Sequence, residues 1–513
     1  MTIRLTDASD LVFSCQTFIN LNLRETPENR DSHSSLTWRK RLLVGAVKMQ
    51  EKHLANPFLP HTAADIQEML SFLGLNEIDQ LFADIPEKVR FNKKLDLPES
   101  HSEAETERHI LELLQFNLTA DDGPFFLGGS IYPDHIPAVV QYLIQRGEFL
   151  TSYTPYAPEI SQGMLQALFE YQSLICELTG MDAANSSMYD WGTALGEAAR
   201  MCARITKKGT FLVPKAIHPD RMATLIAFAK GASIKIEAIP YSLKSGQLEI
   251  EKLENSIDRD CCGIYIENPN LFGVIETEAP MVGQLAQKLE IPLVVGADPI
   301  SLGILTPPGD YGASIVVGEG QSLGLPMSFG GPSFGIFACK YDRKMIRNMP
   351  GRLIGMTKTE KSNRRSFCMT LQTREQHIRR EKATSNICTN NALCAVASAI
   401  YLSLLGPKGI QEHAKLLIGR NRLLAERTNA IDGFKAPVFG ANVPHFRDHV
   451  IQLEKPGKTA ADLNRSLLKA GIIGGKILTH DFQDLGEALL FSVNNRQSLN
   501  DYQRLEDELG RFW

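Results

Sequence analysis

The chain has 513 residues, of which 43% are hydrophobic and 22% are charged, a composition typical of a soluble protein with two or three globular domains. Its 54 basic and 59 acidic residues leave a net charge of −5, which argues against a protein that binds nucleic acid by neutralising phosphates. No run approaches the roughly 18 apolar residues that would cross a membrane. We therefore expect neither a nucleic acid nor a membrane as partner.

Residues 1–57 show no sustained helical or strand period, and we expect them to be an N-terminal extension. Met49 stands just before the first well-patterned segment, so residues 1–48 are either dispensable or precede the true start. They lack the basic start and apolar core of a secretory signal, and their acidic residues argue against a mitochondrial address. The nine cysteines form no Cys-x-x-Cys pair. This predicts reduced thiols in a cytosolic compartment and no metal site, and it leaves a redox role of Cys388 open.

Residues 58–122 have the pattern of a helical arm. Thr62 is a plausible N-cap for a helix that Gly74 ends, and a second helix with an acidic start follows near Ser102. These short helices are expected to form an arm or lid on a larger domain.

Residues 123–388 alternate between helical and strand patterns, which predicts a large α/β domain. The first long helix ends at Gly180 and carries one apolar face, made of Leu165, Leu168, Phe169, Ile175 and Leu178. The strands that follow are apolar nearly throughout, as a parallel sheet covered on both faces requires. They are expected at residues 211–214, 234–241, 262–268, 292–298, 313–319 and 334–340.

The pattern of apolar residues changes at residues 389–513, and we expect a small C-terminal α+β domain there. An apolar helix ends at Gly406–Pro407, and a long helix follows at about 410–430. Two strands, at 448–453 and 488–494, then alternate with two more helices.

Four segments have compositions that structure alone does not easily explain. Residues 153–163 hold Tyr153 and Tyr156 in a proline-stiffened loop, which fits either a ligand-facing wall or a rigid turn before a helix. Residues 185–197 fit a phosphate-binding turn or an N-cap made by Asp190 or Thr193. Residues 317–332 form a glycine-rich turn that fits a ligand cradle. Residues 371–386 gather four fixed cations and a histidine, either as a solvated helix face or as a polar boundary that a ligand reaches.

Two further polar residues stand at strand ends. His218 follows the first strand and is more typical of a structural than of a catalytic histidine. Asp298 closes the fourth strand, at the carboxyl edge where α/β proteins bind ligands. It fits either a partner for a protonated ring nitrogen or a cap for a neighbouring loop.

The sequence closely resembles the glycine-cleavage P-protein family of pyridoxal-phosphate enzymes, from about residue 59 to the C-terminus. The resemblance rests on these strings in order: YTPYAPEISQG, LICELTGMDAANSSMYDWGTALGEA, TPPGDYGASIVVGEGQSLGLP, FGGPSFG, MPGRLIG and LQTREQHIRREKATSNICT. It implies an α/β, aspartate-aminotransferase-like large domain (pyridoxal-phosphate fold type I) and a small C-terminal α+β domain. Within the family, the chain resembles the N-terminal half, or subunit 1, of glycine dehydrogenase (decarboxylating).

The family's catalytic half holds the cofactor on a lysine in a His-Lys-Thr context, followed by a glycine-rich loop. The comparable place here reads Gly320-Gln321-Ser322. Gln321 has no amine that could form a Schiff base, so this chain is predicted not to hold the cofactor covalently. Asp298 and His218 then resemble relics of the catalytic half's site.

The resemblance implies an active site shared with a lysine-bearing subunit 2, in a heterodimer or a dimer of heterodimers. Pyridoxal phosphate held by that subunit would decarboxylate glycine, and the lipoamide of H-protein would accept the aminomethyl group. Tyr153 and Tyr156 are expected to line this site, with His377, Arg379 and Arg380 at its entrance. The split form implies a bacterial cytoplasmic location rather than a mitochondrial matrix.

Two other interpretations remain open at this point. The chain could be a stand-alone pyridoxal-phosphate decarboxylase or desulfurase that uses Lys340 or Lys382. It could also be a non-catalytic scaffold that only completes and stabilises subunit 2.

Overall fold

The structure is a computed structural model that describes residues 61–91, 93, 95–385, 387 and 389–513. The expected extension at 1–57, the start at Met49 and the redox question at Cys388 lie outside the described residues. Contacts divide the chain into two units, Met1–Glu107 and Arg108–Trp513. The division falls inside helix α4 (Glu103–Leu114), upstream of residue 122, where the sequence predicts the arm to end.

The first unit contains the predicted short helices. Helix α3 (Ala63–Phe72) begins with a capping box in which Thr62 and Asp65 satisfy each other's backbone N–H groups. Two 3₁₀ turns follow, η1 (Ile78–Phe82) and η2 (Glu87–Val89). The predicted N-cap at Thr62 is confirmed, and α4 begins directly after Ser102, as expected.

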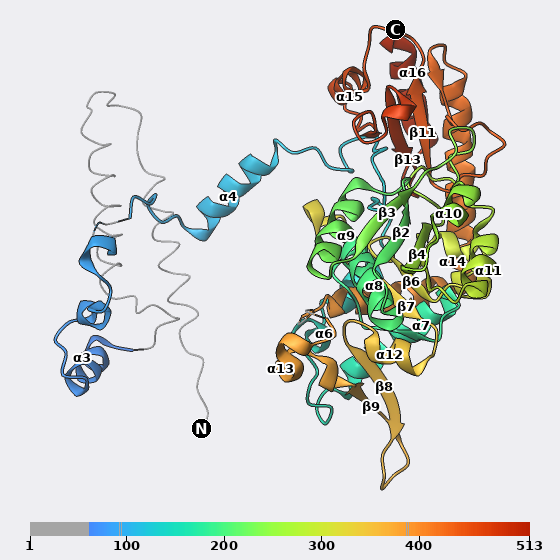
Figure 1. The fold of residues 1–513 in the computed structure, drawn as a ribbon. Coiled ribbons are helices and arrows are strands. Elements are labelled where there is room, and N and C mark those ends of the chain that lie inside the picture. Colours follow the sequence, from blue (N-terminus) through green and yellow to red (C-terminus); the bar gives the residue numbers. More distant parts are fainter. Residues whose placement is uncertain (1–60, 92, 94, 386, 388) are drawn as a thin grey trace, which may run out of the picture. The chain divides into compact units, whose positions relative to one another are not determined.

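A seven-stranded sheet, in the order β1-β7-β6-β5-β4-β2-β3, is the centre of the second unit (Figure 1). Its strands are β1 (Ala183–Ala184), β2 (Thr210–Pro214), β3 (Lys235–Ile239), β4 (Cys261–Glu267), β5 (Leu293–Gly296), β6 (Ile315–Glu319) and β7 (Gly335–Cys339). The six strands predicted from apolar runs are all present. One differs in direction: β7 runs antiparallel to β6, with Glu319 opposite Gly335.

Both faces of strands β2 and β4 to β7 are buried, which explains why these strands are almost entirely apolar, whereas the edge strand β3 keeps an exposed lysine, Lys235. In β2, Leu212 faces the cluster that includes helix α7 (Gln162–Thr179), whereas Phe211 and Val213 face α8 (Trp191–Thr206). Gly180 ends α7 in the left-handed conformation, as predicted. The other helices around the sheet are α5 (Ala138–Ile144), α6 (Gly147–Leu150), α9 (Pro219–Gly231), α10 (Ile250–Ser256), α11 (Ala279–Lys288) and α12 (Arg343–Asn348).

Helix α14 (Ala392–Asn429) breaks at Gly406 (φ 60°), just before Pro407, where the sequence predicts one helix to end and another to begin. Within the described residues it is the one helix long and apolar enough to span a membrane by length and composition. Half of its apolar window is buried inside the protein, and the helix packs against α7 and α5. It is therefore built as a core helix.

A four-stranded antiparallel sheet, in the order β10-β11-β13-β12, forms the C-terminal part of the second unit. It is flanked by α15 and α16 (Figure 1), so the predicted α+β character is present. The elements are β10 (Phe434–Lys435), β11 (Asp448–Leu453), α15 (Ala460–Lys469), β12 (Lys476–Ile477), β13 (Ala488–Ser492) and α16 (Leu499–Phe512).

The structure adds a hairpin that the sequence did not reveal. Strands β8 (Leu353–Lys358) and β9 (Arg365–Thr370) pair antiparallel and project from the second unit (Figure 1). After β9, the short helix α13 (Gln376–Arg379) carries the charged segment that the sequence singled out.

Candidate active site

Polar side chains gather where the parallel strands of the large sheet end. Glu267 closes β4, Asp298 follows β5, and Gln321 follows β6. Because the carboxyl ends of these strands lie at one edge of the sheet, the three residues face the place where proteins of this architecture bind ligands. Glu267 and Gln321 are almost completely buried.

Gln321 is fully occupied as a hydrogen-bonding amide. Its Oε1 accepts from the Tyr132 backbone N–H at 2.9 Å, and its Nε2 donates to the Tyr132 carbonyl at 2.9 Å. The same Nε2 donates to the Leu325 carbonyl at 2.7 Å. Gln321, which the sequence predicts to stand at the family's lysine position, is thus held as a structural clamp between Tyr132 and Leu325.

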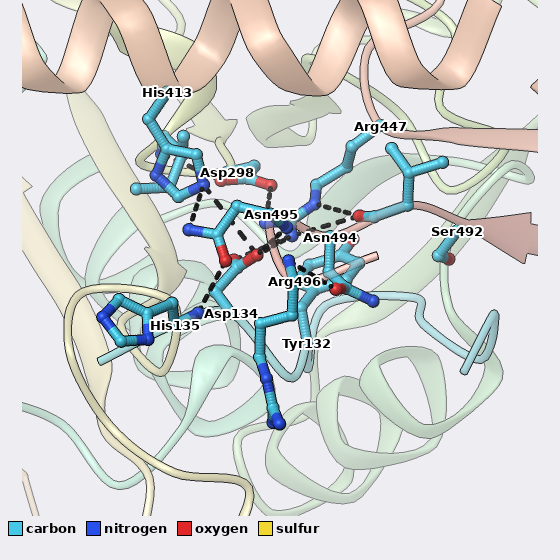
Figure 2. Close-up of polar contacts among 12 residues, drawn as sticks. Tyr132, Asp134, His135, Asp298, His413, Arg447, Ser492, Asn494, Asn495 and Arg496 are labelled. Atoms are coloured by element: carbon cyan, nitrogen blue, oxygen red, sulfur yellow. Dashed lines mark hydrogen bonds and ion pairs between the residues drawn. The ribbon is translucent and has the colours of Figure 1, made fainter. Parts of the chain in front are cut away.

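Arg447 fills the space beside Asp298 (Figure 2). Its Nη2 donates to both carboxylate oxygens of Asp134, at 2.9 and 2.8 Å, and its guanidinium lies 3.5 Å from the centre of the Tyr132 ring. Its Nη1 lies 3.7 Å from Asp298 Oδ2. Arg447 precedes β11, so a side chain from the C-terminal sheet enters the edge of the large sheet.

Burial and the charge of Arg447 shift the pKa values of the neighbouring carboxyl groups in opposite directions. Burial alone would raise the pKa of Asp134, but Arg447 and His413 together lower it to about 2. Burial raises the pKa of Asp298, while Arg447 works in the opposite direction. Asp298 Oδ1 accepts from the Ile300 N–H at 2.9 Å, so Asp298 caps its own loop and faces an arginine rather than an open ring site.

A second buried cluster, around Arg221 and Glu267, lines the small hollow that Tyr132 and Asp298 also border. The Arg221 guanidinium lies 4.0 Å from the centre of the Trp191 ring and donates to Glu267 at 2.8 Å. Tyr265 donates its O–H to Glu267 at 2.8 Å and accepts from Trp191 Nε1 at 3.0 Å. The cavity that remains between this cluster, Tyr132 and Asp298 has a volume of about 20 Å³. That is room for about one water molecule and not for a pyridoxal ring.

The amino end of α8 is occupied by carboxylates. Asp190 is its N-cap and accepts from the Thr193 N–H at 2.7 Å, so the capping interpretation of this segment agrees with the geometry. Glu319 Oε2 accepts from the Trp191 N–H at 3.3 Å, and burial raises the pKa of Glu319 to about 7. A phosphate would meet negative groups here instead of free N–H donors.

His218 is the N-cap of α9. Its Nδ1 accepts from the Asp220 N–H at 3.2 Å, and burial, followed by the nearby Arg221, lowers its pKa to about 3. It is a neutral capping side chain, in agreement with the structural interpretation.

The sequence-predicted wall residues lie in a different part of the second unit, and two of them come together. Tyr156 and His377 meet edge to face, with ring centres 5.8 Å apart. The Tyr153 hydroxyl lies 3.3 Å from that of Thr389, and its ring is 76% exposed. Arg379 and Arg380 are exposed on and just after α13.

Two residues that sequence reasoning missed hold Tyr156 in place. Arg352 Nη2 donates to the Tyr156 hydroxyl at 3.2 Å, and that hydroxyl donates to Glu375 at 3.4 Å. Both side chains are largely buried, and Glu375 also lies 3.6 Å from His377 Nδ1. For Arg352 the signal in the sequence was the arginine of MPGRLIG, a charged residue directly before the partly apolar strand β8.

The lysines considered for a stand-alone cofactor enzyme are not placed for that task. Lys340 follows β7, which is antiparallel to β6, so it lies at the sheet edge opposite Gln321. Its Nζ donates to the Gly180 carbonyl at 2.7 Å. Lys382 is exposed in a 3₁₀ turn (Arg380–Lys382) after α13.

The sheet order, the single antiparallel strand β7 and the acidic residue after β5 define a protein of the pyridoxal-phosphate fold type I class. The residues present do not fit the cofactor itself, because Gln321, which follows β6, has no amine for a Schiff base and the hollow beside Asp298 has a volume of only about 20 Å³. The chain belongs to the glycine cleavage system P-protein family, whose model matches residues 56–470.

Known proteins agree with this assignment. A probable glycine dehydrogenase (decarboxylating) subunit 1 of Pyrococcus horikoshii is 48% identical over 86% of this chain and 96% of its own length. A crystal structure of the glycine cleavage system's glycine decarboxylase (P-protein), in inhibitor-bound form, superposes with a TM-score of 0.80. It is 38% identical and covers 88% of this chain and 99% of its own. The glutamate decarboxylase of Lactobacillus brevis, at 12% identity, 84% and 97% coverage and a TM-score of 0.60, shows the fold alone.

Proposed function

We propose that this chain is the subunit 1 component of a split glycine-cleavage P-protein, active only with a lysine-bearing subunit 2. The observation that supports the proposal is the match to the P-protein family, together with a hollow of only about 20 Å³ beside Asp298 and a residue without an amine, Gln321, after β6. A chain of this kind needs a partner for the chemistry of its family. The relatives come from archaea and bacteria, which supports a prokaryotic cytoplasmic location.

The overall reaction is the cleavage of glycine on the partner's cofactor. Pyridoxal phosphate held by subunit 2 would supply the electron sink for decarboxylation. The carboxyl group of glycine leaves as carbon dioxide, and the aminomethyl group bonds to one sulfur of the oxidised lipoyl arm of H-protein. The electron pair freed by decarboxylation breaks the lipoyl disulfide, and the second sulfur takes a proton.

This chain's own contribution is a wall of the shared site. Tyr153 and Tyr156 present phenol groups from a stiff loop, and His377, Arg379 and Arg380 add cationic or polar groups beside it. Arginine at such a place binds a glycine carboxylate through two parallel N–H donors, which lysine cannot do.

The alternative is a scaffold that contributes no contact to substrate. The small volume of the hollow supports it, because Glu267 and Asp298 there are engaged with Arg221 and Arg447. In an assembled complex, unchanged turnover and unchanged glycine affinity for both Tyr153→Phe and Tyr156→Phe would support the scaffold.

The first experiment is an absorbance scan with added pyridoxal phosphate, on this chain alone and then with subunit 2. We expect no internal-aldimine band from the chain alone. Release of carbon dioxide from glycine should require both subunits and oxidised H-protein. A borohydride-reducible adduct on this chain alone, or decarboxylation without subunit 2, would overturn the proposal.

A further inference from the structure

Arg352 joins the loop that carries Tyr156 to the start of the β8–β9 hairpin. Its Nη1 donates to Thr154 Oγ1 at 3.2 Å, and its Nη2 donates to the Tyr156 hydroxyl at 3.2 Å. The guanidinium also lies 5.3 Å from the centre of the Tyr156 ring. Its side chain is only 8% exposed, so it approaches the phenol from the protein interior.

Glu375 completes the setting of the phenol. It accepts a hydrogen bond from the Tyr156 hydroxyl at 3.4 Å, and its carboxylate lies 4.0 Å from Arg352 Nε. The phenol oxygen thus accepts from an arginine while its proton points at a carboxylate. The direction of the O–H bond is fixed by two charged groups rather than left to rotate.

The residue before Glu375, Arg374, anchors this arrangement to the backbone. Its Nη2 donates to the Gly351 carbonyl at 3.2 Å, and its Nη1 donates to the carbonyls of Ile346 and Met349. The segment before Arg352 and the segment that holds Glu375 are therefore tied to one another. Tyr156 remains 42% exposed although its hydroxyl is hydrogen-bonded to both Arg352 and Glu375. A fixed group with an open face is what a preorganised site requires.

We propose that Arg352 and Glu375 are positioning residues that act through Tyr156 and orient its phenol for the shared active site. This inference rests on the proposed function of the chain. Lysine cannot replace Arg352, because one ammonium cannot donate to Thr154 and Tyr156 in the fork geometry and also stack on the ring. A merely structural role, tying the loop to the hairpin, would stabilise the chain without any dependence on the phenol oxygen.

The test is a double-mutant cycle in the complex reconstituted with subunit 2 and lipoylated H-protein. Arg352→Lys, Tyr156→Phe and the double variant are compared for kcat and for KM for glycine, and assembly is measured by sedimentation. We expect each single variant to lower kcat/KM by about tenfold or more, and the double variant to be no worse than the poorer single. Arg347→Lys, at an exposed site on α12, is the matched control and should change nothing.

Multiplied effects in the double variant would overturn the inference, as would unchanged kinetics of Arg352→Lys or of Tyr156→Phe. If Arg352→Lys does not fold, Glu375→Gln enters the same cycle, because it keeps the shape and removes the charge. A wild-type complex that assembles but does not cleave glycine would instead overturn the proposed function, and the inference with it.

Discussion

Gln321 grips the backbone of Tyr132 from both sides, accepting from its N–H and donating to its carbonyl, each at 2.9 Å. The two residues are 189 positions apart in the chain. Gln321 has no amine that could form a Schiff base, so its side chain serves the fold through hydrogen bonds rather than cofactor chemistry.

Replacing Gln321 with lysine is expected not to restore cofactor binding in this chain. The lysine loses the acceptor for the Tyr132 N–H and places a charge at a site that is almost completely buried. We expect no borohydride-reducible adduct with pyridoxal phosphate and a loss of about 3 kcal/mol or more in the free energy of unfolding. Gln321→Met is the control for the lost hydrogen bonds without the charge. A stable adduct on the lysine variant would contradict this prediction.

Arg447 is expected to be among the most costly side chains to remove. It is fully buried and pairs with Asp134 through two hydrogen bonds. Arg447→Met leaves Asp134 buried without its partner, so urea unfolding should show a loss of about 3–5 kcal/mol. Arg496→Met removes an exposed pair with Asp121 and should cost less than about 1 kcal/mol. Equal losses for the two variants would show that burial of the pair is unimportant.

Glu276 should make the protein less stable as the pH rises toward neutrality. Burial raises its pKa from 4.5 to about 7, against the hydrogen bonds that it accepts from the Leu248 N–H and from Asn270. A carboxyl with a raised folded-state pKa binds more protons folded than unfolded, so its contribution is present below pH 4.5 and lost up to about pH 7. The loss is on the order of 3 kcal/mol.

The measurement for Glu276 is the free energy of unfolding between pH 4.5 and 8. Glu276→Gln resembles the protonated carboxyl, so it should flatten the slope over this window. Glu177→Gln, at an exposed site on α7, should leave the slope unchanged, because Glu177 is not among the groups that shift the pKa of Glu276. If the Glu276 variant keeps the wild-type slope, the titration belongs to another group.

Gly196 is expected to be required for the packing of α8 against α9. A Cβ atom at Gly196 would lie 2.5 Å from Cγ of Phe228. Gly196→Ala should therefore destabilise the protein by about 1–3 kcal/mol, despite the better helix propensity of alanine. Gly419→Ala, in α14 with no atom within 4 Å of the new methyl group, should stabilise by about 0.5–1 kcal/mol. Thermal unfolding of both variants distinguishes a packing effect from a propensity effect.

The sequence predicted the elements better than their directions. An apolar run such as residues 334–340 indicates a buried strand but carries no information on its direction, so antiparallel β7 was not foreseen. The β8–β9 hairpin escaped notice because its strands alternate little and its turn, near residue 361, is highly charged. Helix ends were predictable where glycine or a capping hydroxyl marks them, as at Gly180 and Thr62.

The buried polar centre could not be predicted, because its partners are far apart in sequence. Asp134 and Arg447 are separated by 313 positions, and no local pattern links them. The one available signal was Arg447-Asp448-His449, three polar residues at the start of an apolar strand. For Gln321, the absence of an amine is visible in the sequence itself, whereas its hydrogen bonds to the Tyr132 backbone are not.

The small volume of the hollow means that the stability of this chain does not depend on a bound cofactor. A protein that binds its cofactor gains stability from it in proportion to the logarithm of the cofactor concentration, and loses that stability when the cofactor is scarce. Here the side chains of Arg447, Trp191 and Arg221 fill most of the space at the carboxyl edge of the sheet, so the folded chain does not need a cofactor to fill it. We therefore expect the stability of this chain alone to be independent of the concentration of pyridoxal phosphate.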